Sequence, residues 1–328
     1  MKAVWYDRQG PAREVLVVGE MDDPVPGRGE VRIRLRSSGI NAGDLKKRQD
    51  FFGYGMPYPR VVPHSDGAGL IDAVGDDIDE ARIGERVWCY GAQSYRAFGT
   101  AASCVTLPAT QAVPLPDGIV FEQGACLGIP GITAHRAVHI TGSVAGKTIL
   151  VQGAAGAVGT CTVGLARLAG ATVIGTARSE ADAACARRAG AQHVLRTDGL
   201  HESEVIDAVR AVAADGVDHV VEIAFDKNIS VDMEVLKVGG SIAAYATTAP
   251  DPRIPFWQLL FKNVAIHLVG SDDFSPEYKR AAALDLNEML KAGWGGVVVS
   301  RTFPLEQAAL AHEYLETRRG AGRVVLIV

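Results

Sequence analysis

The stretch KTILVQGAAGAVGTCTVGLARLAGATVIGTA, residues 147–177, decides the fold. Its first apolar run predicts a buried strand that ends at Gly153, and a glycine-rich turn continues to Gly159. The small and apolar residues after the turn have the spacing of a helix, and residues 171–177 predict a second buried strand. Strand, glycine-rich turn, helix and strand in this order are typical of the βαβ unit that binds a dinucleotide.

Each glycine of this turn has a physical role. Gly153 and Gly156 let the backbone turn tightly and approach a pyrophosphate, whereas Gly159 lets the helix press against the sheet. Amide hydrogens at the start of the helix, aided by its dipole, favour phosphate charge. The alternative is a tight turn without a ligand. The expected cofactor contacts are Gly153, Ala154, Ala155, Gly156, Ala157, Val158 and Gly159.

The end of the second strand indicates which dinucleotide binds. An acidic residue about 20 positions after the glycines would bind the ribose hydroxyls of NAD. This chain has Arg178 and Ser179 there, and the first carboxylate in this segment is Glu180. Because arginine can pair with a 2′-phosphate, the sequence favours NADPH. The alternative for Arg178 is a solvated surface arginine.

Length and composition fit two globular domains. The chain has 328 residues and a formal net charge of −5, which gives no electrostatic case for binding nucleic acid or anionic membranes. Its apolar stretches are too short to span a membrane. The five cysteines are scattered without a CxxC pair, as is typical of reduced thiols in the cytoplasm.

The texture of the sequence changes along the chain. Short alternating runs between glycines and prolines in the first hundred residues predict a β-rich, barrel-like domain. Alternating strands and helices then predict a doubly wound parallel sheet, with strands at 147–153, 171–177, 192–195, 217–223, 241–246 and 264–270. The tail is expected to return to the first domain because that sheet is already full. The predicted domains are residues 1–124 with 271–328, and residues 125–270.

Several ordered motifs resemble the medium-chain dehydrogenase/reductase superfamily, and within it the zinc-free quinone oxidoreductase (zeta-crystallin-like) branch. They are GINAGD at 39–44, PHSDGAG at 63–69, GIPGITA at 128–134, the turn at 153–159 and RGAGRVVL at 319–326. His64 stands where the second motif usually has glycine. The resemblance implies an α/β protein with a GroES-like β-barrel catalytic domain and a Rossmann NADP-binding domain, the cofactor NADPH, and a homodimer that often extends its Rossmann sheets across the interface.

The resemblance also implies residues around the substrate. Asn41 matches the family position whose amide faces the substrate, and Thr133 matches a threonine near the nicotinamide. Lys46 stands where the family often has a tyrosine and could supply a proton, while Tyr54 lies on the following loop. Each has a structural alternative: Asn41 as a loop cap, Lys46 as a solvated lysine, Tyr54 as part of a packed surface loop, and Thr133 as a hydroxyl bonded to the backbone.

Further cofactor contacts are expected at strand ends. Arg196 and Arg318 would join Arg178 at the 2′-phosphate, and Arg318 matches a C-terminal arginine of the family. Ligands bind at the carboxyl ends of parallel strands, so the residues after the fifth and sixth strands are expected to line the nicotinamide pocket. These residues are Ala246, Thr247, Gly270 and Ser271.

No catalytic metal is expected. A catalytic zinc needs three protein ligands, and the positions of the zinc-bearing relatives' ligands hold the Asn41 region, Ser65 and Asp66. His64 and Asp66 could still be two of three ligands, but no third soft ligand has a plausible spacing. Without a metal, alcohol oxidation is hard, whereas an electron-poor acceptor can take hydride with only hydrogen bonds to its oxygen.

The sequence therefore predicts an NADPH-dependent, metal-independent reductase that transfers hydride or electrons to a quinone or an activated enone. Two alternatives remain open: an enoyl-thioester reductase, and a non-catalytic, crystallin-like protein that binds NADPH. The expected partner is a small molecule, with neither a membrane nor nucleic acid.

Overall fold

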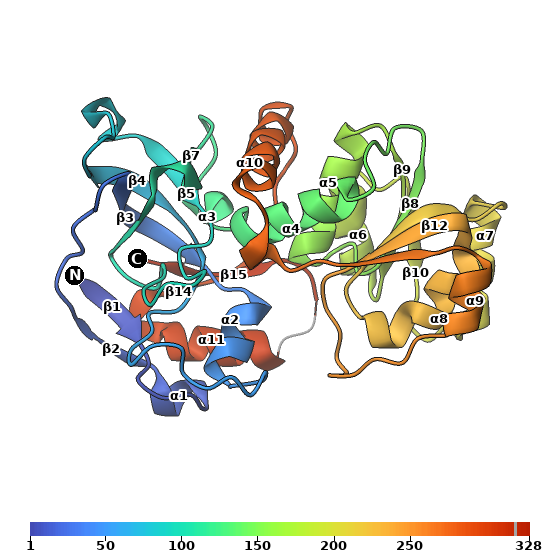
Figure 1. Cartoon of the computed structure of the whole chain (residues 1–328), viewed down its shortest axis with the longest axis horizontal. Coiled ribbons are helices and arrows are strands. Elements are labelled where there is room, and N and C mark those ends of the chain that lie inside the picture. Colours follow the sequence, from blue (N-terminus) through green and yellow to red (C-terminus); the bar gives the residue numbers. More distant parts are fainter. Residues whose placement is uncertain (318–319) are drawn as a thin grey trace. The chain divides into compact units, whose positions relative to one another are not determined.

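The computed structural model describes residues 1–317 and 320–328, which form two compact units (Figure 1). The first unit comprises Met1–Ile129 and Val297–Val328, and the second comprises Pro130–Gly296. Elements of the first unit are β1 (Lys2–Trp5), α1 (Ala12–Val15), β2 (Val17–Glu20), β3 (Glu30–Gly39), α2 (Ala42–Arg48), β4 (Asp66–Val74), η1 (Glu80–Arg82), β5 (Arg86–Cys89), β6 (Cys104–Pro108), η2 (Ala109–Gln111), β7 (Ala112–Pro114), α3 (Phe121–Gly124), β14 (Val299–Pro304), η4 (Leu305–Gln307), α11 (Ala308–Thr317) and β15 (Arg323–Ile327).

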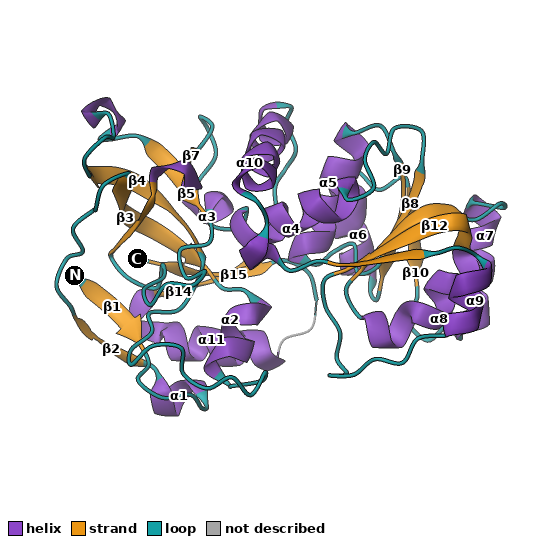
Figure 2. Ribbon diagram, in the orientation of Figure 1, coloured by secondary structure: helices purple, strands orange, loops and turns teal. Residues whose placement is uncertain are grey.

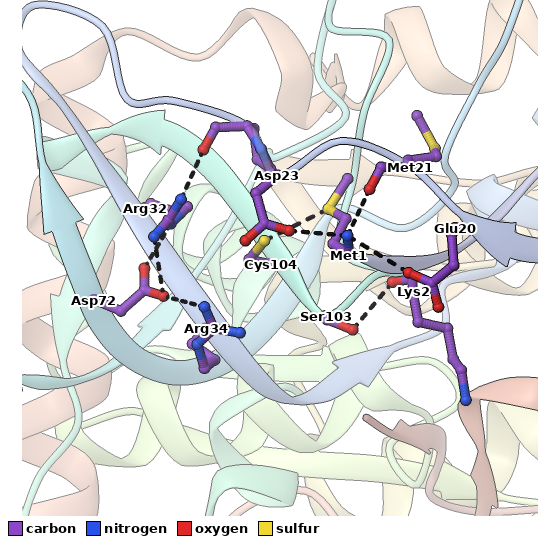
Figure 3. Close-up of polar contacts among 11 residues, drawn as sticks. Met1, Lys2, Glu20, Met21, Asp23, Arg32, Arg34, Asp72, Ser103 and Cys104 are labelled. Carbon is purple, nitrogen blue, oxygen red and sulfur yellow. Dashed lines mark hydrogen bonds and ion pairs between the residues drawn. The ribbon is translucent and has the colours of Figure 1, made fainter.

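The first unit is built on a sheet in the order β14-β15-β3-β4-β5-β7, with β6 paired to β3. Strand β3 forms because apolar and basic residues alternate: Val31, Ile33 and Leu35 are buried in the core beneath the sheet. The arginines between them lie on the other face. Arg32 and Arg34 there both pair with Asp72 of β4, at 2.8 and 2.7 Å (Figure 3).

The amino terminus is anchored to the same unit. The Met1 ammonium lies 2.9 Å from a carboxylate oxygen of Asp23 and 3.6 Å from one of Glu20, and it donates to the carbonyl of Met21 (Figure 3). These contacts hold the start of β1 against the chain that follows β2, where the two strands pair antiparallel.

The second unit is a parallel six-stranded sheet in the order β10-β9-β8-β11-β12-β13, with helices packed on it (Figure 2). This is the strand order of a Rossmann fold, and it reverses between β8 and β11. Its elements are α4 (Gly128–His139), β8 (Thr148–Val151), α5 (Ala157–Leu168), β9 (Thr172–Ala177), α6 (Glu180–Ala189), β10 (His193–Arg196), α7 (Glu202–Val212), β11 (Val217–Glu222), α8 (Phe225–Val235), β12 (Leu236–Ala244), α9 (Phe256–Phe261), β13 (Ala265–Leu268), η3 (Ser271–Asp273) and α10 (Pro276–Lys291). All six strands of the sheet overlap their predicted ranges, although β12 begins at Leu236 and not at Ser241.

Helix α10 belongs to the second unit, whereas the sequence-based expectation placed residues 271–328 together in the first. The reason is close helix packing. A Cβ on Gly131 of α4 would lie 2.5 Å from Leu286, and one on Gly164 of α5 would lie 2.4 Å from Met289. The apolar face of α10 is therefore buried against α4 and α5, and the chain rejoins the first unit only at Val297.

Candidate functional site

The glycine-rich turn after β8 has the geometry of an anion cradle. Gly153 has φ +65°, a conformation that favours glycine, and a Cβ on Gly159 would lie only 2.3 Å from the Gly153 carbonyl oxygen. Gly156 is the N-cap of α5, and within the described chain no side chain caps this end of the helix. The amides of the first turn therefore remain as donors, and the cradle fits the pyrophosphate of a dinucleotide.

A buried polar network supports this turn from below. The Gly153 amide donates to the Thr176 hydroxyl, which donates to the side-chain oxygen Oε1 of Gln152. Nε2 of Gln152 in turn donates to Asp232 Oδ1, and each of these three hydrogen bonds is 2.9 Å long. Burial and the neighbouring Glu222 raise the pKa of Asp232 well above its usual range, and burial also raises that of Glu222. Asp232 therefore favours its neutral form beneath the cradle, beside the Glu222 carboxyl group.

Sequence reasoning missed this network. The signal was present as polar residues at the carboxyl ends of buried strands: Gln152 after β8, Thr176 near the end of β9 and Glu222 at the end of β11. The carboxylate of Glu222 also accepts from Asn228 Nδ2 at 3.0 and 3.1 Å, which ties α8 to the same edge of the sheet.

The three arginines predicted for the 2′-phosphate have different fates. Arg178 is exposed directly after β9, and no ion pair engages it among the described residues. Arg196 is register-paired with Ala177 on the neighbouring strand, but Asp198 holds its guanidinium at 2.6 and 3.0 Å, which offsets the charge it would offer to a phosphate. Arg318 lies outside the described residues. Arg178 therefore remains the cation best placed to bind a phosphate.

The other predicted cofactor residues also follow the carboxyl ends of the parallel strands. Ser179 is the N-cap of α6, and its hydroxyl accepts from the Asp182 amide at 3.1 Å. Thr247, in the loop after β12, donates to Asp226 at 3.0 Å. The carbonyl of Ala246 accepts from the Phe225 amide at 3.2 Å. Gly270 and Ser271 follow β13, and Thr133 is buried on α4 of this unit.

In the first unit, Asn41 lies at the start of α2 beside a buried ion pair. Its side-chain amide donates to Asp66 Oδ2 at 2.8 Å, and Arg323 Nη1 lies 3.1 Å from that oxygen. The other oxygen of Asp66 accepts from the Ile129 amide at 2.8 Å, and a Cβ on Gly128 would lie 2.2 Å from it. Asn41 can both cap the loop and face a substrate, because only one of its two side-chain amide hydrogens is donated to Asp66 and the second can be donated elsewhere.

A second buried carboxyl group lies beside this pair. The backbone amide of Asn41 donates to Asp44 Oδ2 at 2.7 Å, which closes the first turn of α2. Burial raises the pKa of Asp44 to about 7. Burial also raises the pKa of Asp66, although Arg323 opposes the shift.

Lys46 and Tyr54 do not join this buried ion pair and belong to an exposed aromatic cluster with Phe51 and Phe52. The Lys46 ammonium lies 4.8 Å from the ring centroid of Phe51, and Tyr54 stacks on Phe52 at 5.9 Å. Tyr54 is 88% exposed. The structure therefore brings Lys46 of α2 and Tyr54 of the following loop into one aromatic cluster, whereas Asn41 at the start of that helix is held by other contacts.

Comparison with known proteins identifies the family. Residues 27–117 match the family model of the alcohol dehydrogenase GroES-like domain, and residues 157–288 match that of a zinc-binding dehydrogenase. A quinone oxidoreductase of Mus musculus is 33% identical over 337 residues, with 100% of this chain and 98% of the relative covered. The chain belongs to the medium-chain dehydrogenase/reductase superfamily, in its quinone oxidoreductase branch. The predicted architecture of a GroES-like domain and a Rossmann domain is thereby confirmed.

Solved structures agree with this assignment to the superfamily. A mycobacterial protein solved as a complex with NADPH is 26% identical, with a TM-score of 0.86 and complete coverage of both chains. A quinone oxidoreductase of Pseudomonas syringae is 25% identical, with a TM-score of 0.85, and covers 100% of this chain and 99% of its own. Among the described residues of this superfamily member, no helix is both long and apolar enough to cross a bilayer.

The zinc-binding description of one family model calls for a test at His64 and Asp66. His64 is fully buried with φ +78°, a backbone conformation that favours glycine, and its Nε2 lies 2.9 Å from Nε2 of His312. Arg48 Nε lies 3.3 Å from the other nitrogen of His312. Because arginine only donates, His312 must accept there and donate to His64 through Nε2.

The hydrogen bonds from Arg48 through His312 to His64 continue as a chain, the histidine row, to the backbone of Asp66. His64 Nδ1 therefore carries a proton toward Ser38 at 2.9 Å, Ser38 lies 2.7 Å from the Thr100 hydroxyl, and Thr100 donates to the Asp66 carbonyl at 2.6 Å. Burial lowers the pKa of His64 to about 3, so the ring stays neutral. Both ring nitrogens of His64 are engaged and the Asp66 carboxylate is paired with Arg323, so this pair does not fit a metal ion.

Proposed function

We propose that this chain is an NADPH-dependent, metal-independent reductase that transfers hydride or electrons to a quinone or an activated enone. The observation that carries the proposal is the uncapped start of α5 at the glycine cradle, together with an exposed arginine, in place of a carboxylate, directly after β9. The quinone oxidoreductase relatives and the NADPH complex of the mycobacterial neighbour support the same assignment.

The chain's own residues have separate tasks. The first-turn amides of α5 would hold the pyrophosphate, and Arg178 with Ser179 would hold the 2′-phosphate. Bound NADPH supplies the hydride. Asn41 would donate its second amide hydrogen to the acceptor oxygen, where negative charge develops during reduction. The residues proposed to line the nicotinamide pocket are Thr133, Ala246, Thr247, Gly270 and Ser271.

Lys46 and Tyr54 are the candidates for delivering a proton to the reduced acceptor. Their place in the exposed aromatic cluster also suits a wall against which a flat quinone ring stacks. Lys46→Ala and Tyr54→Phe distinguish these tasks. A proton donor affects kcat and its pH profile, whereas a stacking wall affects mainly KM.

A stopped-flow acceptor screen with NADPH tests the proposed function. We expect rapid NADPH oxidation by naphthoquinone or phenanthrenequinone, or by alkenals and enones, and unchanged rates after dialysis against EDTA. Faster turnover of crotonyl-CoA would instead identify an enoyl-thioester reductase. Tight NADPH binding without turnover of any acceptor would identify a non-catalytic binding protein. Activity lost with EDTA and restored by zinc would reject metal independence.

We extend the proposal to a homodimer. Strand β13 is the edge of the parallel sheet, and the adjoining α9 exposes Phe256, Trp257 and Phe261 at 56, 64 and 74%. Such an apolar cluster beside an open sheet edge is typical of a protein interface. Light scattering should give twice the chain mass, and Trp257→Asp should reduce it to that of a monomer. A monomeric wild-type protein would contradict the dimer.

We also propose a cytoplasmic location. All five cysteines are buried thiols, as expected for a protein kept in a reducing compartment. Localisation of the tagged chain in its own cells tests this placement.

A further inference from the structure

Helices α4 and α10 bring two histidines and a carboxylate together in the second unit, where the helices lie side by side (Figure 1). His135 and His139 are four residues apart on α4, and Asp285 faces them from α10. One ligand atom from each of the three lies within 4.8 Å of the others. His135 Nε2 is already 3.1 Å from Asp285 Oδ2, and the two imidazole centroids are 4.7 Å apart.

The scaffold around this group is tightly packed. Residues at i and i+4 share a helix face, so Gly131 lies on the same face of α4 as the two histidines. Because Gly131 has no Cβ, the side chain of Leu286, the neighbour of Asp285, comes within 2.5 Å of the position that a Cβ would occupy. The Arg136 guanidinium lies 4.1 Å from the ring centroid of Tyr278, a second contact between the helices. The three side chains therefore converge from backbones already in close contact.

The donor chemistry suits a transition metal. Two imidazoles and a carboxylate bind Zn²⁺ with bonds of about 2.0–2.2 Å, so bound ligand atoms lie about 3.3 Å apart. The His135–Asp285 pair already has this separation. His139 is partly buried and the Asp285 side chain is 46% exposed, so both have room to turn toward an ion and leave positions for water.

The charges around the group favour neutral imidazoles. Burial lowers the pKa of both histidines, His139 and Arg136 lower that of His135 further, and Asp285 opposes the shift at both rings. A neutral imidazole has a lone pair available for a metal, so binding needs no loss of a proton near neutral pH. The guanidinium of Arg136 is held over the Tyr278 ring.

We propose that His135, His139 and Asp285 bind one divalent first-row transition-metal ion, with Zn²⁺ as the best fit, and that the ion joins α4 to α10. The site shares no residue with the glycine cradle or the Asp66 ion pair, so it goes beyond the proposed reductase function. The sequence was tested for a metal site only at the ligand positions of the zinc-bearing relatives, and the His135-x₃-His139 spacing was passed over. Asp285 is far away in sequence, and only the fold joins it to the pair.

Cobalt titration of the whole chain tests the proposal after any bound metal has been removed with EDTA. We expect one Co²⁺ per chain, with visible d–d absorption that Zn²⁺ abolishes by displacement. His139→Ala and Asp285→Asn should each weaken Co²⁺ binding by at least about tenfold. His193→Ala, which removes an exposed histidine on β10 of the same unit, should leave binding unchanged. Both site variants replace partly exposed side chains, and circular dichroism and NADPH binding check that they fold.

Zinc should also raise the melting temperature of the wild type and of His193→Ala, but not of the two site variants, because only a ligand of the folded state stabilises it. Three outcomes would overturn the proposal: no saturable binding of Co²⁺, equal affinity in site and control variants, or a sulfur-to-cobalt charge-transfer band that assigns the ion to a cysteine. These measurements do not depend on reductase activity, so failure of the proposed function and failure of the metal site are separately visible.

Discussion

Asp44 should make the protein lose stability as the pH rises through neutrality, and Asp44→Asn should remove that loss. Burial raises the pKa of this carboxyl from 3.8 to about 7 in the folded chain. The folded state therefore binds the proton more tightly than the unfolded state. The resulting stability is complete below pH 3.8 and is lost as the pH rises to about 7.

The magnitude follows from the two pKa values. The difference of 7 − 3.8, about 3 units, corresponds to about 4 kcal/mol lost at pH 8, at 1.36 kcal/mol per unit. At pH 5 less than half of this stability is lost. An asparagine keeps an oxygen that can accept from the Asn41 amide and carries no charge. The stability difference between the variant and the wild type should therefore shift toward the variant by about 2–3 kcal/mol between pH 5 and pH 8.

Urea unfolding across this pH range measures the effect, and hydrogen exchange of peptides covering α2 and β3 assigns it to the first unit. Asp22→Asn, which removes an exposed carboxylate of the same unit, is the matched control and should follow the wild type. Parallel pH profiles for Asp44→Asn and the wild type would refute the argument, because they would mean that the carboxyl is ionised in the folded chain without cost.

Three further predictions concern the cradle and the phosphate. Gly156→Val should fold, because a Cβ there meets only the Gly153 carbonyl oxygen at 3.3 Å, yet it should lose NADPH binding in a fluorescence titration. Gly159→Ala should instead lower the melting temperature, because its Cβ would lie 2.3 Å from that oxygen. Retained NADPH affinity in Gly156→Val would contradict the placement of the pyrophosphate at this turn. NADPH should bind at least about tenfold more tightly than NADH, a preference that Arg178→Ala removes and Arg188→Ala retains; equal affinities in the wild type would contradict the 2′-phosphate site. Asp232→Asn should gain stability over the wild type in urea unfolding as the pH rises above 3.8, since burial and the neighbouring Glu222 raise the pKa of the aspartate. A stability difference that does not change with pH would contradict the raised pKa.

The sequence predicted the second unit well because its inner strands β8, β9 and β11 are buried on both faces. Continuous apolar runs such as residues 147–151 and 171–177 are diagnostic in a parallel sheet. The amphipathic pattern of α10 showed that one face is buried, but not that α4 and α5 cover it, so residues 271–296 were assigned to the wrong unit. A pattern local to one segment carries no information about its packing partner.

The predicted site residues show the same limit. Gly159 could be assigned a role from sequence because its constraint lies within the same turn. Whether Arg196 can bind a phosphate depends on its ion pair with Asp198. That ion pair depends on side-chain geometry, which the spacing of residues in the sequence does not reveal. The contact of His64 with His312 joins residues 248 positions apart, and no periodicity could indicate it.

The histidine row has one consequence for how this chain can vary. Every bond in it points the same way, from the guanidinium of Arg48 to the peptide oxygen of Asp66. Restoring the ordinary glycine at position 64 would relax the backbone there, yet it would strand the proton on His312 Nε2 in a dry interior at a cost of about 1–3 kcal/mol. Substitutions at positions 64 and 312 should therefore be energetically coupled: losing His64 should cost less stability when His312 has also been replaced by an apolar residue.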